Sequence, residues 1–167
     1  MTEMVSSESS LEALAVLWRE AWTSAEREAF AACCAARVRY EDPVADEPLE
    51  GLDALAEHAA RYRDAFPDLR IEPSGQPVME GRFGCVPWRL AGTHNGAFAG
   101  IPASGRFVVL QGIHYLELAD GRVRRARGFF DLYDAAVQLG LLPARGSLAE
   151  AALMLVRGFG LRAPRSD

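Results

Sequence analysis

The residue with the best chemical case is Asp42, in the segment Tyr40-Glu41-Asp42-Pro43. A carboxylate close to aromatic side chains such as Tyr40 and Trp18 is expected to have a raised pKa, which a general base working near neutrality needs. An Asp before Pro is also a common cap of a turn. The sequence leaves both roles open for Asp42.

His114 is the second candidate, and it lies in an apolar stretch typical of a strand. It is either a buried neutral histidine with one hydrogen bond or a group that contacts substrate. Its neighbour depends on the hairpin turn at Asp120-Gly121. A three-residue loop pairs His114 with Gly128 and leaves an empty spot beside the imidazole for substrate. A two-residue turn pairs His114 with Arg127 instead.

Two further residues have weaker cases. Asp131 follows the last predicted strand, where it either caps a helix or serves as a catalytic acid three residues beyond Gly128. His94 lies in a glycine-rich segment near a turn, which favours a tether to Ser104 over substrate contact. The predicted catalytic residues are Asp42, His114 and Asp131.

Helical patterns come first along the chain. Ser9 and Glu12 have the spacing of a capping box and precede apolar residues at helical intervals, which predicts a helix from Ser9. A second box at Thr23 and Glu26 predicts a short helix to about Ala36.

A third helix is predicted between Asp53, its cap, and Pro67, which ends it. His58 is predicted on its exposed side, without a partner. Its apolar face consists of Leu52, Leu55, Ala56, Ala59, Tyr62 and Phe66.

Strand-like alternation follows, separated by Gly and Pro. The predicted strands are 68–72, 83–94, 107–118 and 122–130, with a short earlier one at 38–42. Three helices followed by a meander of long strands predict an α+β domain. A twisted sheet of this size curls, so we expect a curved antiparallel sheet whose concave side, packed on the helices, encloses a conical pocket.

The last part of the chain is predicted to be an extension, 141–167, after a short helix at 131–139 closed by Gly140. Ser147 caps an amphipathic helix with an apolar face of Leu148, Ala151, Ala152, Leu155 and Phe159. Since short isolated helices are marginal in water, we expect this face to be buried. It covers the open end of the cone, packs elsewhere on its own domain or, nearly as well, forms a dimer contact. Residues 1–10 are predicted to be disordered, and 11–140 form the domain.

Aromatic residues around the pocket would suit a flat polycyclic or polyunsaturated substrate. Most of them are expected in the core, with only those near the cavity mouth touching the substrate. The predicted substrate-binding residues are Trp18, Trp22, Tyr40, Tyr62, Phe66, Trp88, His94, Gln111 and Phe129.

The composition argues against several classes of function. The 167 residues fit one domain, and the 18 basic residues are all Arg, against 23 acids, for a net charge of −5. A chain without Lys cannot form a lysine Schiff base. A mildly acidic chain has no broad electrostatic reason to bind nucleic acid or an anionic membrane. No apolar run approaches the roughly 20 residues of a membrane span.

The spacing of cysteines and histidines favours neither a metal nor a cofactor site. Cys33, Cys34 and Cys85 are an odd number without metal-type spacing, and the adjacent pair is expected in the core. With a polar N-terminus, this predicts a reducing, cytoplasmic location. The three histidines are dispersed, and no glycine-rich loop opens a helix after a strand. We therefore expect no metal and no cofactor.

One further pattern extends from about Leu11 to Gly140. It consists of Tyr40-Glu41-Asp42-Pro43, Ala65-Phe66-Pro67-Asp68-Leu69, Trp88, Gly92 to Arg106, Asp120-Gly121-Arg122-Val123, Asp131 and Gln138-Leu139-Gly140. This pattern resembles the SnoaL-like polyketide cyclase family. The resemblance implies the cone-shaped fold shared with nuclear transport factor 2, ketosteroid isomerases and limonene-type epoxide hydrolases.

The resemblance also implies functional residues, with gaps. Polyketide cyclases use a His and, fourteen residues later, an Asp as an acid–base pair; the His matches His114, but the later position is Gly128. The segment around Asp42 is similar to the one that bears the general-base aspartate of bacterial ketosteroid isomerases. The oxyanion tyrosine and aspartate of those isomerases fall on Trp18 and Ile113.

These observations predict a cofactor-independent enzyme of secondary metabolism that performs acid–base chemistry on a carbonyl-bearing, polyketide-like small molecule, by cyclisation or isomerisation. Asp42 is the expected base and His114 the acid or carbonyl polariser. The alternatives are a non-catalytic binding or assembly module, which Gly128 favours, and an epoxide-opening enzyme. A sheet with helices on one side leaves residues such as Val109 or Val123 to be covered, which predicts a homodimer through the convex face.

Overall fold

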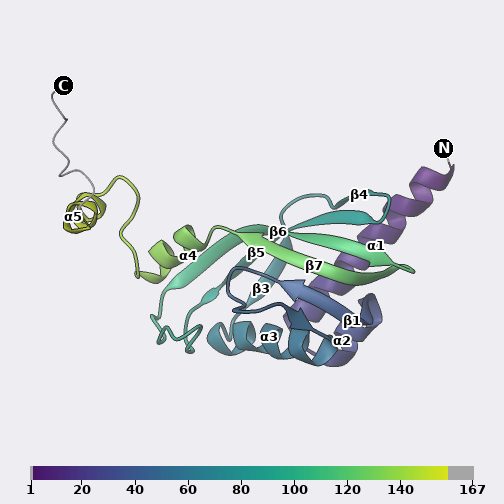
Figure 1. Ribbon diagram of the computed structural model, residues 1–167, viewed down its shortest axis with the longest axis horizontal. Helices are drawn as coiled ribbons and strands as arrows, with labels where there is room; N and C mark the ends of the chain where they lie inside the picture. The colour runs from purple at the N-terminus through teal and green to yellow at the C-terminus, as the bar shows by residue number, and fades with distance from the viewer. Residues whose placement is uncertain (1, 158–167) are drawn as a thin grey trace, which may run out of the picture.

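Three helices lie against one face of a curved, seven-stranded sheet, and two short helices follow it (Figure 1). The computed structural model describes residues 2–157, with side chains from residue 11 onward. The helices are α1 (Thr2–Ser24), α2 (Arg27–Cys33), α3 (Leu52–Ala65), α4 (Leu132–Leu139) and α5 (Leu148–Val156). The strands are β1 (Cys34–Glu41), β2 (Leu49–Glu50), β3 (Arg70–Pro73), β4 (Val78–Glu80), β5 (Phe83–Thr93), β6 (Phe107–Ala119) and β7 (Arg122–Phe130).

The sheet confirms the predicted α+β class. Its strand order is β2-β1-β7-β6-β5-β3, and β4 pairs with the other part of β5. All pairings are antiparallel except that of β1 with β7, which is parallel. The parallel pair places the end of β1, just before Asp42, beside β7. Tyr40 thereby pairs with Ala126, two residues from Gly128.

The hairpin between β6 and β7 combines the two predicted alternatives. Its turn has two residues, Asp120 and Gly121, both with positive φ (51° and 73°), as the turn that matches the twist of a hairpin requires. A one-residue bulge at Arg124 then shifts the register. His114 consequently faces Gly128, the pairing expected from the longer loop.

The helix boundaries differ from those predicted by capping boxes. α1 begins at Thr2, ahead of Ser9, and so includes most of the segment predicted to be disordered. Thr23 lies within this same helix, where its hydroxyl donates to the carbonyl of Arg19. α2 ends at Cys33 because the chain turns into β1 there.

The third helix starts after Gly51, not at a side-chain cap from Asp53. Asp53 instead forms an ion pair with Arg27 of α2, at 2.7 Å. The predicted position of His58 on the exposed side is wrong, since the residue is 3% exposed. It lies one helical turn from Leu55 and Tyr62, on the face that packs against the sheet.

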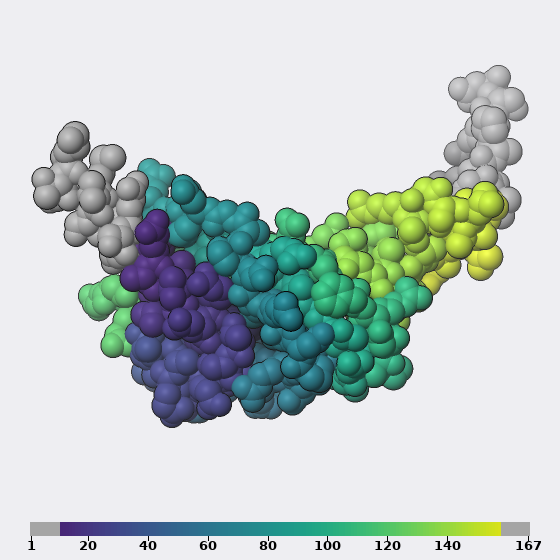
Figure 2. Space-filling view, turned by 180° about the vertical axis from the view of Figure 1, so that it is seen from behind, coloured from purple at the N-terminus to yellow at the C-terminus, as the bar shows by residue number. Residues whose placement is uncertain are grey.

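The C-terminal helix is the part that departs most from expectation. Ser147 caps α5 as predicted, accepting the backbone N–H of Glu150. None of the helix residues is buried, and Leu148 is 92% exposed. In Figure 2 this segment, in yellow, projects from the body of the molecule. The expected burial of this face within the chain is therefore wrong; Phe159 lies outside the described residues. Within residues 2–157, no helix is long and apolar enough to cross a membrane.

Candidate active site

The narrow end of the cone holds a small cavity of about 30 Å³, which we call the inner cavity. This volume accommodates one or two water molecules, or the carbonyl end of a larger molecule. Its polar walls are Tyr40, Asp42, Tyr62 and His114. Its apolar walls are Trp22, Ile71, Trp88, Leu90 and Phe130. Predicted catalytic and substrate-binding residues from distant parts of the chain therefore meet in one place.

Asp42 follows β1 directly, and its side chain is 1% exposed. Its Oδ1 accepts the backbone N–H groups of Val44 and Ala45, each at 2.8 Å. These bonds fix the turn at Pro43, so the capping role is real. The carboxylate is nevertheless part of the cavity wall, so one residue serves both of the roles left open by the sequence.

The second oxygen of Asp42 accepts three side-chain donors. His58 Nε2 is 2.8 Å from Oδ2, the Tyr62 hydroxyl 3.1 Å and the Tyr40 hydroxyl 3.2 Å. Burial by itself raises the pKa of Asp42. The hydrogen bond and charge of His58, together with the two backbone N–H groups, lower it by a larger amount, so that the net pKa is below its ordinary value. The predicted raised pKa is wrong. Asp42 is a buried carboxylate whose charge is held by five donors.

His58 is the functional residue that the sequence reasoning missed. Because an ionised carboxylate only accepts, His58 must donate through Nε2. Its Nδ1 is buried and has no hydrogen-bond partner among the described residues. The signal was present in the helical spacing, since Leu55, His58 and Tyr62 recur every three to four residues.

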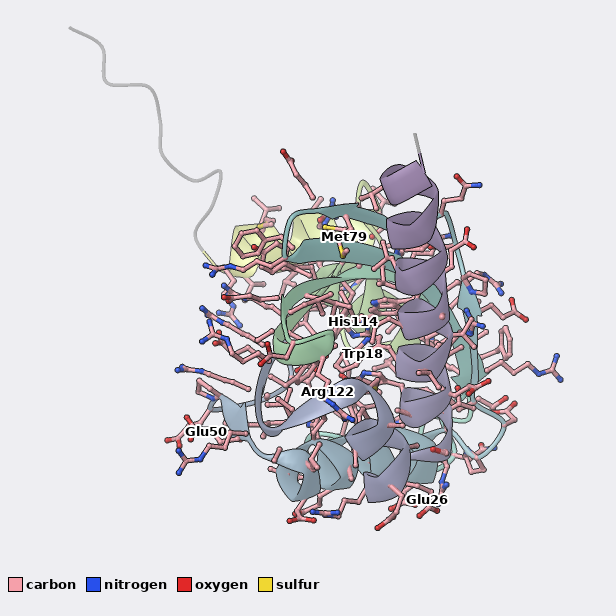
Figure 3. The ribbon with its side chains drawn as sticks, turned by 90° about the vertical axis from the view of Figure 1, so that its right-hand side faces the viewer. Trp18, Glu26, Glu50, Met79, His114 and Arg122 are labelled. Atoms are coloured by element: carbon pink, nitrogen blue, oxygen red, sulfur yellow. The ribbon has the colours of Figure 1, made fainter. Side chains whose placement is uncertain are left out.

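His114 is held as a neutral imidazole. Trp18 on α1 points toward it (Figure 3) and donates its indole N–H to Nδ1 at 3.0 Å, so the imidazole proton is on Nε2. That nitrogen lies 3.4 Å from the Tyr40 hydroxyl oxygen. Burial lowers the pKa of His114 to about 3, against a smaller opposing effect of Asp42. The ring of Trp22 stacks on it with centroids 5.3 Å apart.

The empty spot expected opposite His114, at Gly128, is occupied. Gly128 faces His114 as predicted, but a Cβ atom there would be 2.5 Å from the hydroxyl oxygen of Tyr40. The tyrosine hydroxyl fills the space that the glycine leaves.

A larger cavity, the mouth cavity, borders the inner cavity on the side of α4 and has a volume of about 380 Å³. It shares Tyr62, Leu90 and Phe130 with the inner cavity. Its other walls are mostly apolar and include Phe66, Phe98, Ile101, Val108, Leu110, Ala135, Ala136 and Leu139. Its volume is typical of a small-molecule site, and a neutral, largely apolar body fits its lining.

A third cavity, of about 330 Å³, opens on the α1 side. It shares Trp22, Ile71, Trp88 and His114 with the inner cavity, and Trp18 also lines it. Charged side chains at its edge are Glu12, Arg19 and Glu72. The inner cavity therefore adjoins a larger space on each side.

Two predicted substrate-binding residues point away from the cone. Gln111 on β6 is exposed on the outer face of the sheet, because it is three residues from the inward-facing His114. Phe129 on β7 is 43% exposed and faces outward beside Ile113. Conversely, Val123 is fully buried, because the bulge at residue 124 lets it face the core, so it needs no cover on the outer face.

Two other candidates are structural. Asp131 caps α4 by accepting the N–H of Asp134 at 2.9 Å, and its side chain is more than half exposed, so it does not replace the missing acid. His94 is fully buried, and its Nδ1 lies 3.1 Å from the Ser104 hydroxyl, which confirms the predicted tether. Among the described residues, no cluster of His, Cys, Asp and Glu side chains could hold a metal ion.

Comparison with known sequences identifies one family. The sequence profile of the SnoaL-like polyketide cyclases matches residues 12–139. A comparison with curated proteins gives no match.

Solved structures share the fold over most of the chain. TsrD from Streptomyces laurentii superposes with a TM-score of 0.71 at 23% identity, over 80% of this chain and 97% of TsrD. A protein from Jannaschia sp. CCS1, named as a candidate SnoaL-like polyketide cyclase, gives the same TM-score and identity over 81% and 94% of the two chains. A protein from Catenulispora acidiphila with a ketosteroid isomerase-like fold, in complex with trimethylamine, gives 0.65 at 16% identity over 77% and 93%. At these identities the likeness establishes the fold alone.

Proposed function

The chain belongs to the SnoaL-like polyketide cyclase family, and on that premise we propose that it is a cofactor-independent acid–base enzyme acting on a carbonyl-bearing, polyketide-like small molecule. The reaction type is cyclisation or isomerisation, in secondary metabolism of the antibiotic type. The observation that carries this proposal is that Asp42 and His114 line one inner cavity, with Tyr40 in contact with both.

The two adjoining cavities suggest how a substrate is held. Its apolar body occupies the mouth cavity, and its carbonyl group enters the inner cavity. Asp42 takes a proton from the carbon next to the carbonyl, because it is the ionised group in the cavity wall. His114 donates Nε2–H toward the carbonyl oxygen, since a neutral imidazole with Nδ1 engaged by Trp18 has that proton to offer.

The test is hydrogen exchange at carbon, which needs no knowledge of the natural substrate. 2-Tetralone, a flat bicyclic ketone, is incubated with the protein in D₂O, and loss of its α-proton signals is followed by NMR. We expect the wild type to exceed the buffer rate and Asp42→Asn to reduce the enzymatic rate about 100-fold or more. Tyr115→Phe is the matched control for variants of the site, because Tyr115 stacks on Phe83 outside the cone.

A second candidate function is a non-catalytic binding module of the same fold. It is favoured by the saturation of Asp42, whose five donors leave no free lone pair in the unliganded protein. Fluorescence titration with 2-naphthol, a flat analogue of the enol of 2-tetralone, separates the two functions. Binding without exchange by the wild type would favour the module and contradict the enzyme.

A homodimer through the outer face of the sheet is part of the proposal. Phe83, Ile113 and Phe129 are 38%, 39% and 43% exposed there, which is apolar surface that a second copy would cover. Ile113→Glu should then give a monomer in sedimentation velocity. Leu148→Glu, on the exposed face of α5, tests the alternative contact. A wild-type monomer at micromolar concentration would contradict both.

A cytoplasmic location is proposed because the cysteines are unpaired. Cys33, Cys34 and Cys85 are free thiols, and the Sγ atoms of the adjacent pair lie 3.8 Å apart without a disulfide. A reducing compartment keeps such a pair reduced.

A further inference from the structure

The residue opposite His114 is Gly128, and other residues occupy the space in which a side chain at this position would lie. A Cβ atom on Gly128 would lie 2.5 Å from Tyr40 Oη, 3.2 Å from Asp42 Cβ and 3.5 Å from His114 Cδ2. The first distance is too short for any side chain to coexist with the hydroxyl. Gly128 is therefore the residue that lets Tyr40 reach the centre of the site.

The hydrogen bonds around Tyr40 have a fixed direction. His114 carries its proton on Nε2, because Nδ1 accepts from Trp18, and this N–H points at the Tyr40 oxygen. Asp42 is ionised and only accepts, so the Tyr40 hydroxyl donates to it. The chain of donors runs from His114 through Tyr40 to Asp42.

Tyr40 is also the most weakly held donor of the carboxylate. Its distance to Asp42 Oδ2 is 3.2 Å, against 3.1 Å for Tyr62 and 2.8 Å for His58. A carboxylate has about four lone-pair positions, and Asp42 has five donors, three of them on Oδ2. Since Oδ2 has two lone-pair positions and three donors, Tyr40 can leave while His58 and Tyr62 keep the charge compensated.

We propose that Tyr40 is a catalytic residue whose hydroxyl turns from Asp42 to the carbonyl oxygen of a substrate, and that Asp42 acts as the base once the Tyr62 hydroxyl, the next longest of its side-chain bonds, gives way as well. The idea rests on the proposed function and deepens it. In the free protein Asp42 is masked by its donors, and one of them, Tyr40, later stabilises the enolate that Asp42 forms.

The proton and electron movements balance. With Tyr40 and Tyr62 turned away, His58 keeps one lone pair of Asp42 Oδ2, the other takes the proton from the α-carbon, and the C–H bonding pair becomes the new carbon–carbon double bond. The carbonyl π pair moves to oxygen, where it accepts hydrogen bonds from Tyr40 O–H and His114 Nε2–H. Asp42 is then a carboxylic acid that returns its proton, to another carbon in an isomerisation. In a ring closure it protonates the oxygen of a second carbonyl, which the enolate carbon has attacked.

This arrangement specifies a substrate class. The masked base carries a negative charge in a cavity of about 30 Å³, so a carboxylate group close to the reacting carbonyl would be repelled. We infer a neutral ketone with an enolisable carbon, attached to a planar apolar body of the size of the mouth cavity.

Tyr40→Phe, with Tyr115→Phe as the matched control, tests the inference by two measurements. The first is 2-naphthol affinity, which should fall about fivefold because one hydrogen bond to its oxygen is lost. The second is the pH dependence of 2-tetralone exchange. The groups that face Asp42 are Tyr40, Tyr62, His58 and, through Tyr40, His114. Removing the Tyr40 donor makes Asp42 easier to protonate, so the acid limb should move to higher pH as the plateau rate falls at least tenfold.

The outcomes separate this inference from the proposed function. If the wild type exchanges no protons, the proposed function fails, whereas unchanged 2-naphthol affinity in Tyr40→Phe would still count against contact by Tyr40. If the wild type is active and Tyr40→Phe keeps its rate, affinity and acid limb, the role of Tyr40 is wrong and the proposed function stands.

Gly128→Ala gives a second, independent test. The added methyl group displaces the Tyr40 hydroxyl, so this variant should show the same shifted acid limb and weaker 2-naphthol binding as Tyr40→Phe. Combined with Tyr40→Phe, it should add little, because the hydroxyl it displaces is already gone. Additive losses in the double variant, with both single variants folded by circular dichroism, would overturn the steric argument. If Gly128→Ala does not fold, Tyr40→Phe alone decides the matter.

Discussion

The two adjoining cavities, the inner one at the narrow end and the mouth cavity at the wide end, differ in what holds their walls in place. At the narrow end, the five donors to Asp42 and the Trp18 bond to His114 bind the polar groups to one another within about 3 Å. At the wide end, the walls are side chains such as Phe98, Leu110 and Ala136, which make no such bonds. Directional bonds fix positions to a fraction of an ångström, whereas apolar packing tolerates changes of shape. Chemistry is therefore expected to depend on the narrow end and selection of the substrate body on the wide end.

The largest effect is expected from Asp42→Ala, which tests whether the hydrogen-bond network stabilises the narrow end. It leaves His58, two tyrosine hydroxyls and two backbone N–H groups buried without their acceptor. Loss of a buried charged partner costs about 3–5 kcal/mol, so we expect a decrease of this size in the unfolding free energy from urea titration. Asp64→Ala, at an exposed position of the same helix as His58, is the control and should change it by less than about 0.5 kcal/mol. Equal effects of the two would show that the network does not hold the narrow end.

The second prediction concerns acid stability and His114. Its pKa is about 3 in the folded chain and about 6.5 when unfolded, so between these values the unfolded state binds more protons. Stability is therefore complete above about pH 6.5 and falls as the pH decreases toward 3, with a slope of up to about 1.4 kcal/mol per pH unit.

His114→Gln should remove this part of the slope, as measured by urea titrations at several pH values between 4 and 7. His94, whose pKa is also lowered by burial, contributes in the same direction and is unchanged in the comparison. An identical slope in the wild type and His114→Gln would show that His114 is not held neutral.

The third prediction fills the mouth cavity. Ala136→Trp places an indole in the wall contributed by α4, where the residue is only half-buried. We expect 2-naphthol affinity to fall about tenfold while the melting temperature changes little. Ala151→Trp on exposed α5 is the matched control. If only the control position affected binding, the ligand would not enter by the mouth cavity.

The smallest effect is expected from truncation after Pro143, which removes α5. The helix buries none of its described residues, and its hydrogen bonds to the body include one from the Tyr133 hydroxyl to Glu150. We expect unchanged 2-naphthol affinity and a nearly unchanged melting temperature. Loss of affinity would restore the lid that the sequence predicted, and dissociation of a dimer in sedimentation would favour the interface.

Much of this layout could be predicted from periodicity. The strands, the helix after them and the closing glycine follow from alternation and capping, because those signals are local. The side of a strand or helix on which some residues lie could also be predicted from their spacing. Gln111 and His114 are three apart on one strand, so they had to face opposite sides, and the spacing of His58 placed it on the buried side of α3.

The electrostatics of Asp42 could not be predicted in this way. Its low pKa depends on His58, sixteen residues away, and on two N–H groups of a turn whose geometry only the fold defines. The environment of Gly128 is similar, since Tyr40 reaches it through the parallel pairing of β1 with β7. Such a contact between strands far apart in sequence leaves no periodic trace.

The bulge at Arg124 has a consequence for how the gene can change length. The bulge is a one-residue surplus in the last strand, so deletion of codon 124 would leave a hairpin with strict alternation and with His114 still opposite Gly128. Deletion of codon 126 would instead move every following residue of the strand to the opposite face and bring an outward-facing side chain in front of the histidine. Position 124 is therefore a place where the hairpin can lose a residue and keep Gly128 opposite His114.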